Sequence, residues 1–247
     1  MPPTLTDLVN SLRKVHGDAL RTIAVYGSAA AGEHAPGHSD INVLVIVDDV
    51  PVSQLREEGN ATREWVAAGN LPPFTLTSAE WRASADVFPM EYSDIQARHK
   101  VLHGEPPPGG VAVKPDDLRL ELERESMGKL IHLRLGVMQA AGDPAREAEL
   151  MLAAFSTFTA ICRGLLRLQG MEVSLDDAEV IRSTASVAGF DAAPPLRVLE
   201  HRRGQRPLES AEVAGLMEGY VLAAARIADF VDRMWRSSAD GSRTRDA

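Results

Sequence analysis

A turn of small residues and two polar side chains are the features of this chain best suited to chemistry. Gly27 and Ser28 follow an apolar run that ends at Tyr26. After a spacer of eleven residues, Asp40 and Asn42 begin a second apolar run. A Gly-Ser turn lets main-chain N–H groups and a small hydroxyl approach a triphosphate without a clash from Cβ. Residues two apart on a strand point to the same face, so Asp40 and Asn42 can share one side of a sheet. The pattern predicts a site for nucleotide phosphates and for Mg²⁺, which prefers oxygen ligands.

A carboxylate in addition to Asp40 and Asn42 would complete such a site, because it could bind the metal or take the proton of an acceptor. The expected strand over 73–77 contains no acid, and the acids of the next expected strand, 88–95, are Glu91 and Asp94. Strand alternation places Glu91 and Tyr92 on opposite faces. We take Glu91 as the candidate. Asn42 carries no charge, so we expect it to hold Mg²⁺ more weakly than a carboxylate would.

Each of these residues also has a simpler interpretation. Gly27 and Ser28 can form a plain turn at the exit of a strand, and Asp40 can cap the start of the next one. Asn42 can satisfy a neighbouring backbone group, and Glu91 can be a half-exposed strand residue. The nucleotide interpretation is favoured because the turn comes together with a second strand at a suitable spacing.

The apolar patterns place this motif in a first half that mixes strands and helices. Thr4 or Thr6 can cap a first helix that Gly17 ends. Residues 20–26 and the β-branched run 40–47 predict strands, the second of them buried on both faces of the sheet. The remaining elements expected here are a helix over 51–68, a strand over 73–77, a helical turn over 78–81, a strand over 88–95 and the start of a helix over 96–102.

Prolines and glycines between residues 104 and 110 mark a domain boundary, since neither a helix nor a strand should cross them. We expect a first domain over 1–104, a linker over 105–115, a helical domain over 116–236 and a disordered tail over 237–247. The helical domain should contain a long helix from about 116, helices over 145–168, 175–188 and 195–201, and a last helix that opens at 209–210. The fold class is therefore α+β, a mixed sheet with flanking helices followed by an all-helical bundle.

The run from Val25 to Ser28, the eleven-residue spacer and the run from Asp40 to Val45 resemble the signature of the nucleotidyltransferase superfamily with the DNA polymerase β-like fold. The all-helical second half is similar to that of aminoglycoside nucleotidyltransferases, particularly the adenylyltransferases. The resemblance covers mainly residues 1–104, with looser support from 116–236. It implies a Mg²⁺-dependent transfer of an NMP, AMP by preference, from an NTP to a hydroxyl of a small molecule or a protein.

The resemblance also implies roles for individual residues. Gly27 and Ser28 would hold phosphates, and Asp40 would be a catalytic metal ligand. Asn42, which stands where the superfamily has an acid, would be a weaker metal and nucleotide ligand. Glu91 would assist the acceptor, and the cleft between the two halves would be the site.

Asn42 keeps a second function open, in which the chain retains the fold with lost or reduced catalysis. It would then act as a nucleotide-binding or protein-interaction module. Restoring a carboxylate at position 42 separates the two hypotheses, because only a weakened metal site should bind Mg²⁺ more tightly in response.

The composition of the chain limits which classes of partner it can bind and in which cellular compartment we expect it. The formal net charge of −9 and the pI near 5.3 argue against a protein that coats nucleic acid through bulk charge. The single cysteine, Cys162, excludes an internal disulfide and a thiolate zinc cage. With no secretory leader and no apolar run of about 20 residues, we expect a cytoplasmic protein with no membrane partner. The apolar helices could bury a homodimer interface. The loop with Arg202, Arg203 and Arg206 is first an exposed loop, and an anion site is the alternative.

Overall fold

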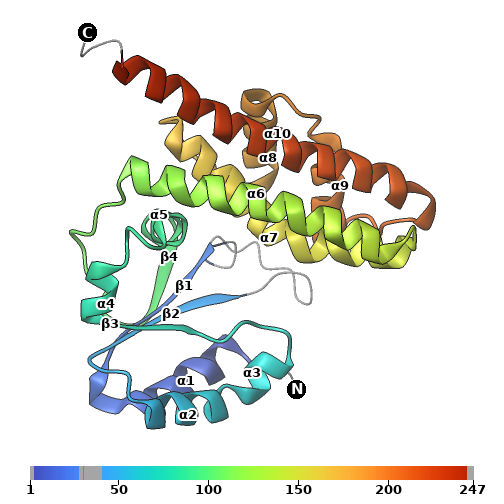
Figure 1. The fold of residues 1–247 in the computed structure, drawn as a ribbon. Helices are drawn as coiled ribbons and strands as arrows, with labels where there is room; N and C mark the ends of the chain where they lie inside the picture. Colours follow the sequence, from blue (N-terminus) through green and yellow to red (C-terminus); the bar gives the residue numbers. More distant parts are fainter. Residues whose placement is uncertain (1–2, 28–29, 31–40, 244–247) are drawn as a thin grey trace. The chain divides into compact units, whose positions relative to one another are not determined.

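The computed structural model describes residues 3–27, 30 and 41–243, with side chains as far as residue 234. The chain divides into two compact units, residues 1–114 and 115–247. The division falls at the end of the proline-rich segment over 105–115. The ribbon of Figure 1 follows the chain through both units.

The first unit is built on a four-stranded sheet with the order β3-β2-β1-β4. Strand β1 (Leu20–Tyr26) pairs antiparallel with both β2 (Asn42–Val47) and β4 (His99–Gly104). Strand β3 (Phe74–Thr77) runs parallel to β2. Val43 to Val47 are all buried, which confirms the prediction that this run is a central strand covered on both faces.

Helices cover the two faces of the sheet separately (Figure 1). One face packs against α1 (Leu5–His16) and against Trp65 of α3 (Arg63–Ala67), with α2 (Val52–Ala61) beside α1. The other face packs against Trp81 of α4 (Ser78–Ala83) and against α5 (Pro89–Ala97). Reciprocal hydrogen bonds between Thr4 and Asp7 begin α1. Gly17, the first residue of the short 3₁₀ helix η1 (Gly17–Ala19), ends α1 as expected.

Two predicted elements of this unit are wrong. Residues 88–95 were expected as a strand, but α5 occupies Pro89–Ala97. Pro89 supplies the backbone angle of a first helical position, and Tyr92 and Ile95 are buried three residues apart, at helical spacing. Residues 96–102 were expected to begin a helix, but β4 starts at His99. Its pairing with β1, which no local pattern reveals, decides that conformation.

The predicted helix over 51–68 is also divided in two. Helix α2 ends at Ala61 and α3 begins at Arg63. Between them, the Thr62 hydroxyl donates a hydrogen bond of 2.9 Å to the carbonyl oxygen of Glu58. Such a bond competes with the helical backbone pattern and bends the chain.

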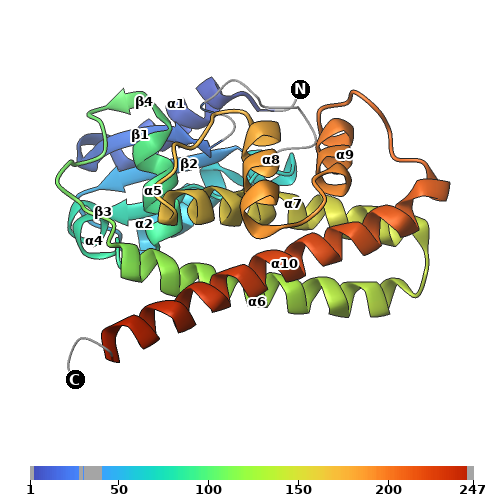
Figure 2. The ribbon, with the colours of Figure 1, turned by 90° about the horizontal axis from the view of Figure 1, so that it is seen from above.

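The second unit contains five helices over its described residues. They are α6 (Pro115–Ala140), α7 (Pro144–Leu168), α8 (Asp177–Ala188), α9 (Ala193–Arg202) and α10 (Ser210–Arg243). Helix α7 contacts the other four (Figure 2). Together with the mixed sheet, these helices confirm the predicted α+β fold class.

Helices α7 and α10 each differ from a simple sequence expectation. Helix α7 is long and apolar enough to cross a membrane by length and composition alone, although 61% of its most apolar window is buried in the chain. That degree of burial is typical of the core helix of a bundle. Helix α10 continues to Arg243, whereas the tail from residue 237 was expected to be disordered. The chain has no proline there, and each residue added to an existing helix gains one hydrogen bond.

Candidate functional site

The end of β1 and the beginning of β2 bring Gly27 and Asn42 together. Tyr26 lies opposite Asn42 in the antiparallel pairing, and Gly27 follows directly. Gly27 has a φ of +72°, in the region that only glycine adopts readily. A Cβ at this position would lie 3.4 Å from Nδ2 of Asn42. The two residues therefore form one turn-and-amide unit at this edge of the sheet.

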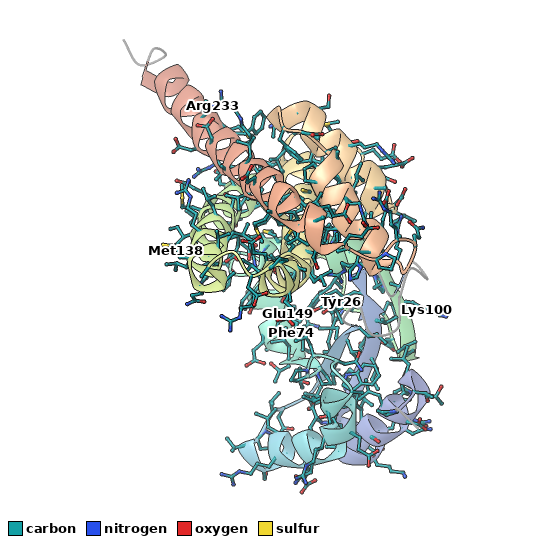
Figure 3. The ribbon with its side chains drawn as sticks, turned by 90° about the vertical axis from the view of Figure 1, so that its right-hand side faces the viewer. Tyr26, Phe74, Lys100, Met138, Glu149 and Arg233 are labelled. Carbon is teal, nitrogen blue, oxygen red and sulfur yellow. The ribbon has the colours of Figure 1, made fainter. Side chains whose placement is uncertain are left out.

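Asn42 lies on the face of the sheet that α4 and α5 cover. Side chains two apart on a strand share a face, and Leu44 and Ile46 of β2 pack against Trp81 and Tyr92 on this face. Directly opposed residues of an antiparallel pair also share a face. Tyr26 therefore belongs to this face with Asn42, and it packs at the edge of the same cluster, as does Phe74 (Figure 3).

Two acids of α5 lie close enough to Tyr26 for their charges to affect the pKa of its hydroxyl. Burial raises the pKa of Tyr26, and the negative charges of Glu91 and Asp94 raise that pKa further. Glu91 is in the first turn of α5 and exposed, and Asp94 is half-buried one turn later. Because residues three apart are neighbours on a helix, the two carboxylates can face the same region. The structure thus places Glu91 near Tyr26, through a helix rather than the expected strand.

Sequence reasoning missed Tyr26 and passed over Asp94. The period-two interpretation of 88–95 separated the two acids, since it placed Glu91 and Asp94 on opposite faces of a strand. The spacing of three between them, next to Pro89, is the signal that could have found them together.

The described residues do not by themselves form a magnesium site. Within them, no group of three or more His, Cys, Asp or Glu side chains could hold a metal ion. Two expected site residues, Ser28 and Asp40, lie outside the described residues. Asn42 contributes a neutral amide, so a metal site at this end of the strands would need further ligands besides Asn42.

Strand β3 contributes aromatic rather than acidic character to this face. Phe74 lies beside Leu44 in the parallel pairing. The rings of Phe74 and Phe88 meet edge to face, with centroids 6.0 Å apart. The absence of an acid from 73–77, noted in the sequence, therefore leaves an apolar border next to the edge that carries Asn42.

The arginine-rich loop of the second unit is engaged within its own bundle. Arg202 lies over the ring of Phe155, 4.9 Å from its centroid. Arg203 forms an ion pair of 2.8 Å with Asp176. Arg206 lies 3.4 Å from Glu212, which also binds the buried Arg197. These contacts favour a structural role, joining α7, α8, α9 and α10, over the alternative of an anion site.

No protein-family model and no curated protein sequence matches the chain. Among solved structures, the chain is similar to spectinomycin adenyltransferase AAD(9) from Enterococcus faecialis, crystallised with ATP and spectinomycin. The TM-score is 0.58 at 12% sequence identity, over 92% of this chain and 98% of that protein. At this identity the similarity concerns the fold. The fold of this chain, a mixed sheet followed by helices, is thus similar to the fold of this adenyltransferase.

Proposed function

We propose that this chain is a cytoplasmic nucleotidyltransferase that moves an NMP, AMP by preference, from an NTP to a hydroxyl of a small molecule. The observation that carries the proposal is the contact between the Gly27 turn and Asn42, at the end of two neighbouring strands. The shared fold with an adenyltransferase supports it. Two carboxylates, Glu91 and Asp94, act electrostatically on Tyr26 beside this contact.

The proposed reaction assigns one task to each group. The acceptor oxygen forms a bond to the α-phosphorus of the NTP, the bond between the α-phosphorus and its bridging oxygen breaks, and pyrophosphate leaves. Main-chain N–H groups at Gly27 and Ser28 hold phosphate oxygens. Glu91, which is exposed in the first turn of α5, takes the proton of the acceptor hydroxyl.

Magnesium belongs to the proposal as a requirement to be tested. Asp40 and the carbonyl oxygen of Asn42 would be its protein ligands. Bound there, the ion would neutralise charge on the phosphates. Of these two residues, Asn42 is the one that the structure describes.

We propose a polyhydroxylated small molecule as the acceptor. The similar adenyltransferase was crystallised with spectinomycin, so spectinomycin is the first compound to test, followed by other aminoglycosides. A protein hydroxyl is the next acceptor class.

A ligand-stabilisation screen, followed by a transfer assay, tests the proposal. Each common NTP is added with and without Mg²⁺, and the unfolding temperature is measured. We expect a Mg²⁺-dependent rise with one NTP, ATP by preference, because a ligand that binds only the folded state raises stability by mass action. ATP labelled at the α-phosphate should then pass its label to an acceptor, with equimolar release of pyrophosphate. No rise under any condition contradicts the proposal.

One observation favours a second function, a catalytically degenerate protein that binds a nucleotide or a protein partner. At the start of β2 stands the neutral Asn42 in place of an acid. The neighbouring strand β3, which begins with Phe74, contains no acid either. This protein would either bind a nucleotide without Mg²⁺ dependence or bind none, and it would release no pyrophosphate with any acceptor. The same screen and assay therefore distinguish the two functions.

A further inference from the structure

Helix α6 carries a row of exposed apolar side chains. Its five members, with the exposed fraction of each, are Leu120 (63%), Met127 (45%), Ile131 (47%), Leu135 (46%) and Met138 (67%). Their spacings of seven, four, four and three residues place all five on one side of a helix with 3.6 residues per turn. We call this set the α6 stripe.

The α6 stripe lies opposite the side by which α6 joins its own bundle. The buried side of the helix includes Leu122, Leu130 and Leu133. Helix α6 contacts α7 and α10 within the second unit, and Figure 3 shows Met138 at the outer edge of that unit. A contiguous row of exposed apolar side chains on a soluble domain marks an interaction surface more often than a plain solvent face.

The charges along α6 differ in sign between its two halves. Before the stripe's midpoint, residues 116–126 contain five carboxylates and two arginines. After it, residues 129–140 contain Lys129 and Arg134 and no carboxylate. The two ends of the stripe therefore lie in fields of opposite sign.

A second copy of the same helix complements this arrangement when it runs antiparallel. A two-fold axis through the midpoint sets Leu120 beside Met138 of the partner subunit, and Met127 beside Ile131 of the partner subunit. It also sets each acidic half beside a basic half. Glu123 and Arg134 lie on the same flank of the stripe, so the axis brings each Glu123 near Arg134 of the partner subunit. A parallel pairing would set acid beside acid.

We propose that the α6 stripe is the interface of a homodimer in which two α6 helices pack antiparallel. The apolar row supplies the buried area, and the charge gradient selects the antiparallel orientation. Because one helix per subunit supplies a small interface, the dimer forms in a concentration-dependent manner.

Sedimentation velocity of the full chain, from low to high micromolar concentration, tests the proposal. We expect a monomer that converts to a dimer as concentration rises. Ile131→Glu, at the centre of the stripe, should keep the chain monomeric throughout this range, with an unchanged unfolding temperature because the side chain is exposed. Val52→Glu is the matched control. It places the same charge at an apolar position that is 64% exposed on α2, and it should dimerise like the unmodified chain.

Charge reversal tests the orientation. Glu123→Arg and Arg134→Glu should each weaken the dimer several-fold at low salt, because each creates like-charge neighbours at both symmetric positions. An equimolar mixture of the two variants should recover the dimer, since every cross-subunit pair is again of opposite sign. A chain that stays monomeric at all concentrations, or a dimer that Ile131→Glu leaves intact, overturns the proposal. Single reversals without effect overturn the antiparallel pairing.

Discussion

The side-chain amide of Asn42 lies directly against the left-handed backbone of Gly27. The φ of Gly27 is +72°, and a Cβ there would be 3.4 Å from Nδ2 of Asn42. The positive φ calls for glycine at this position, whereas a Cβ would only reach ordinary van der Waals contact with the amide. Because the turn and the amide lie close together, a substitution at either residue tests the site.

Gly27→Ala should weaken nucleotide binding and lower the free energy of unfolding by about 1–2 kcal/mol, the usual cost of a left-handed backbone for an L-residue. Binding is measured by titration calorimetry, and stability by urea unfolding. Gly69→Ala is the control, because Gly69 has a φ of +92° and no atom within 4 Å of its added Cβ. It should carry a similar backbone strain and bind nucleotide normally. Equal binding by both variants contradicts a phosphate role for the Gly27 turn.

Asn42→Asp should strengthen Mg²⁺-dependent nucleotide binding by roughly tenfold, because it adds a charged oxygen ligand to a cation site. The dissociation constant of the preferred NTP is measured at several Mg²⁺ concentrations. Asn70→Asp, at a half-buried asparagine outside the site, is the control for added charge and should leave the constant unchanged. If Asn42→Asp changes nothing, the degenerate function is favoured over the enzyme.

Glu91→Gln should lower the rate of transfer by about 10²-fold while nucleotide binding changes little, since it removes a proton acceptor and keeps the shape of the side chain. The assay compares the rate at saturating substrates with the dissociation constant of the NTP. Glu57→Gln, on the exposed side of α2, is the matched control. Equal rates for both variants exclude Glu91 as the base and direct attention to Asp94.

Glu58→Leu should lower the free energy of unfolding by about 3 kcal/mol, because it breaks a buried polar network. Oε2 of Glu58 lies 3.0 Å from Nε2 of His16 on α1, and its Oε1 accepts a hydrogen bond of 2.7 Å from the Thr75 hydroxyl on β3. Only 5% of Glu58 is exposed. The same change at the neighbouring, exposed Glu57 should stay within about 0.5 kcal/mol of the unmodified chain. Urea unfolding compares the two, and equal losses would mean that the network contributes nothing.

Stability should fall as pH rises between 10 and 12, because the chain has three tyrosines and the pKa of each is raised in the folded state. Burial raises the pKa of Tyr92 to about 12 and is also the main cause for Tyr26 and Tyr220. The unfolded chain loses these protons nearer pH 10, so between pH 10 and 12 the folded state holds more protons than the unfolded state. The free energy of unfolding therefore falls as pH rises through this range.

The phenolate absorbance of the native chain should therefore stay low at a pH where the urea-unfolded chain is largely ionised. Tyr92→Phe serves as the internal check, since it should make the fall of stability with pH less steep. A native titration centred at pH 10 would contradict the burial of these hydroxyls.

Local sequence patterns predicted most of the elements in this chain, with α5 and β4 as the exceptions. The apolar runs over 20–26 and 43–47 have the composition of buried strands, and the stripes after residue 115 have the period of helices. The spacing from Gly27 to Asn42 was enough to predict that a turn and a polar strand start would meet on neighbouring strands, which the antiparallel pairing confirms. The roles of Ser28 and Asp40 stay predictions.

The tertiary structure alone decided which groups surround that edge. Residues 88–95 fit a strand by alternation and a helix by Pro89 and the spacing of three, and their packing against the sheet agrees with the helix that carries Glu91. No sequence pattern indicates that Glu58 is buried between α1 and β3, since its partner His16 lies 42 positions away in the chain. Periodicity reports how a segment relates to its own neighbours. Burial and charge at a site depend on contacts between distant segments, which exist only once the sheet and its helices have assembled.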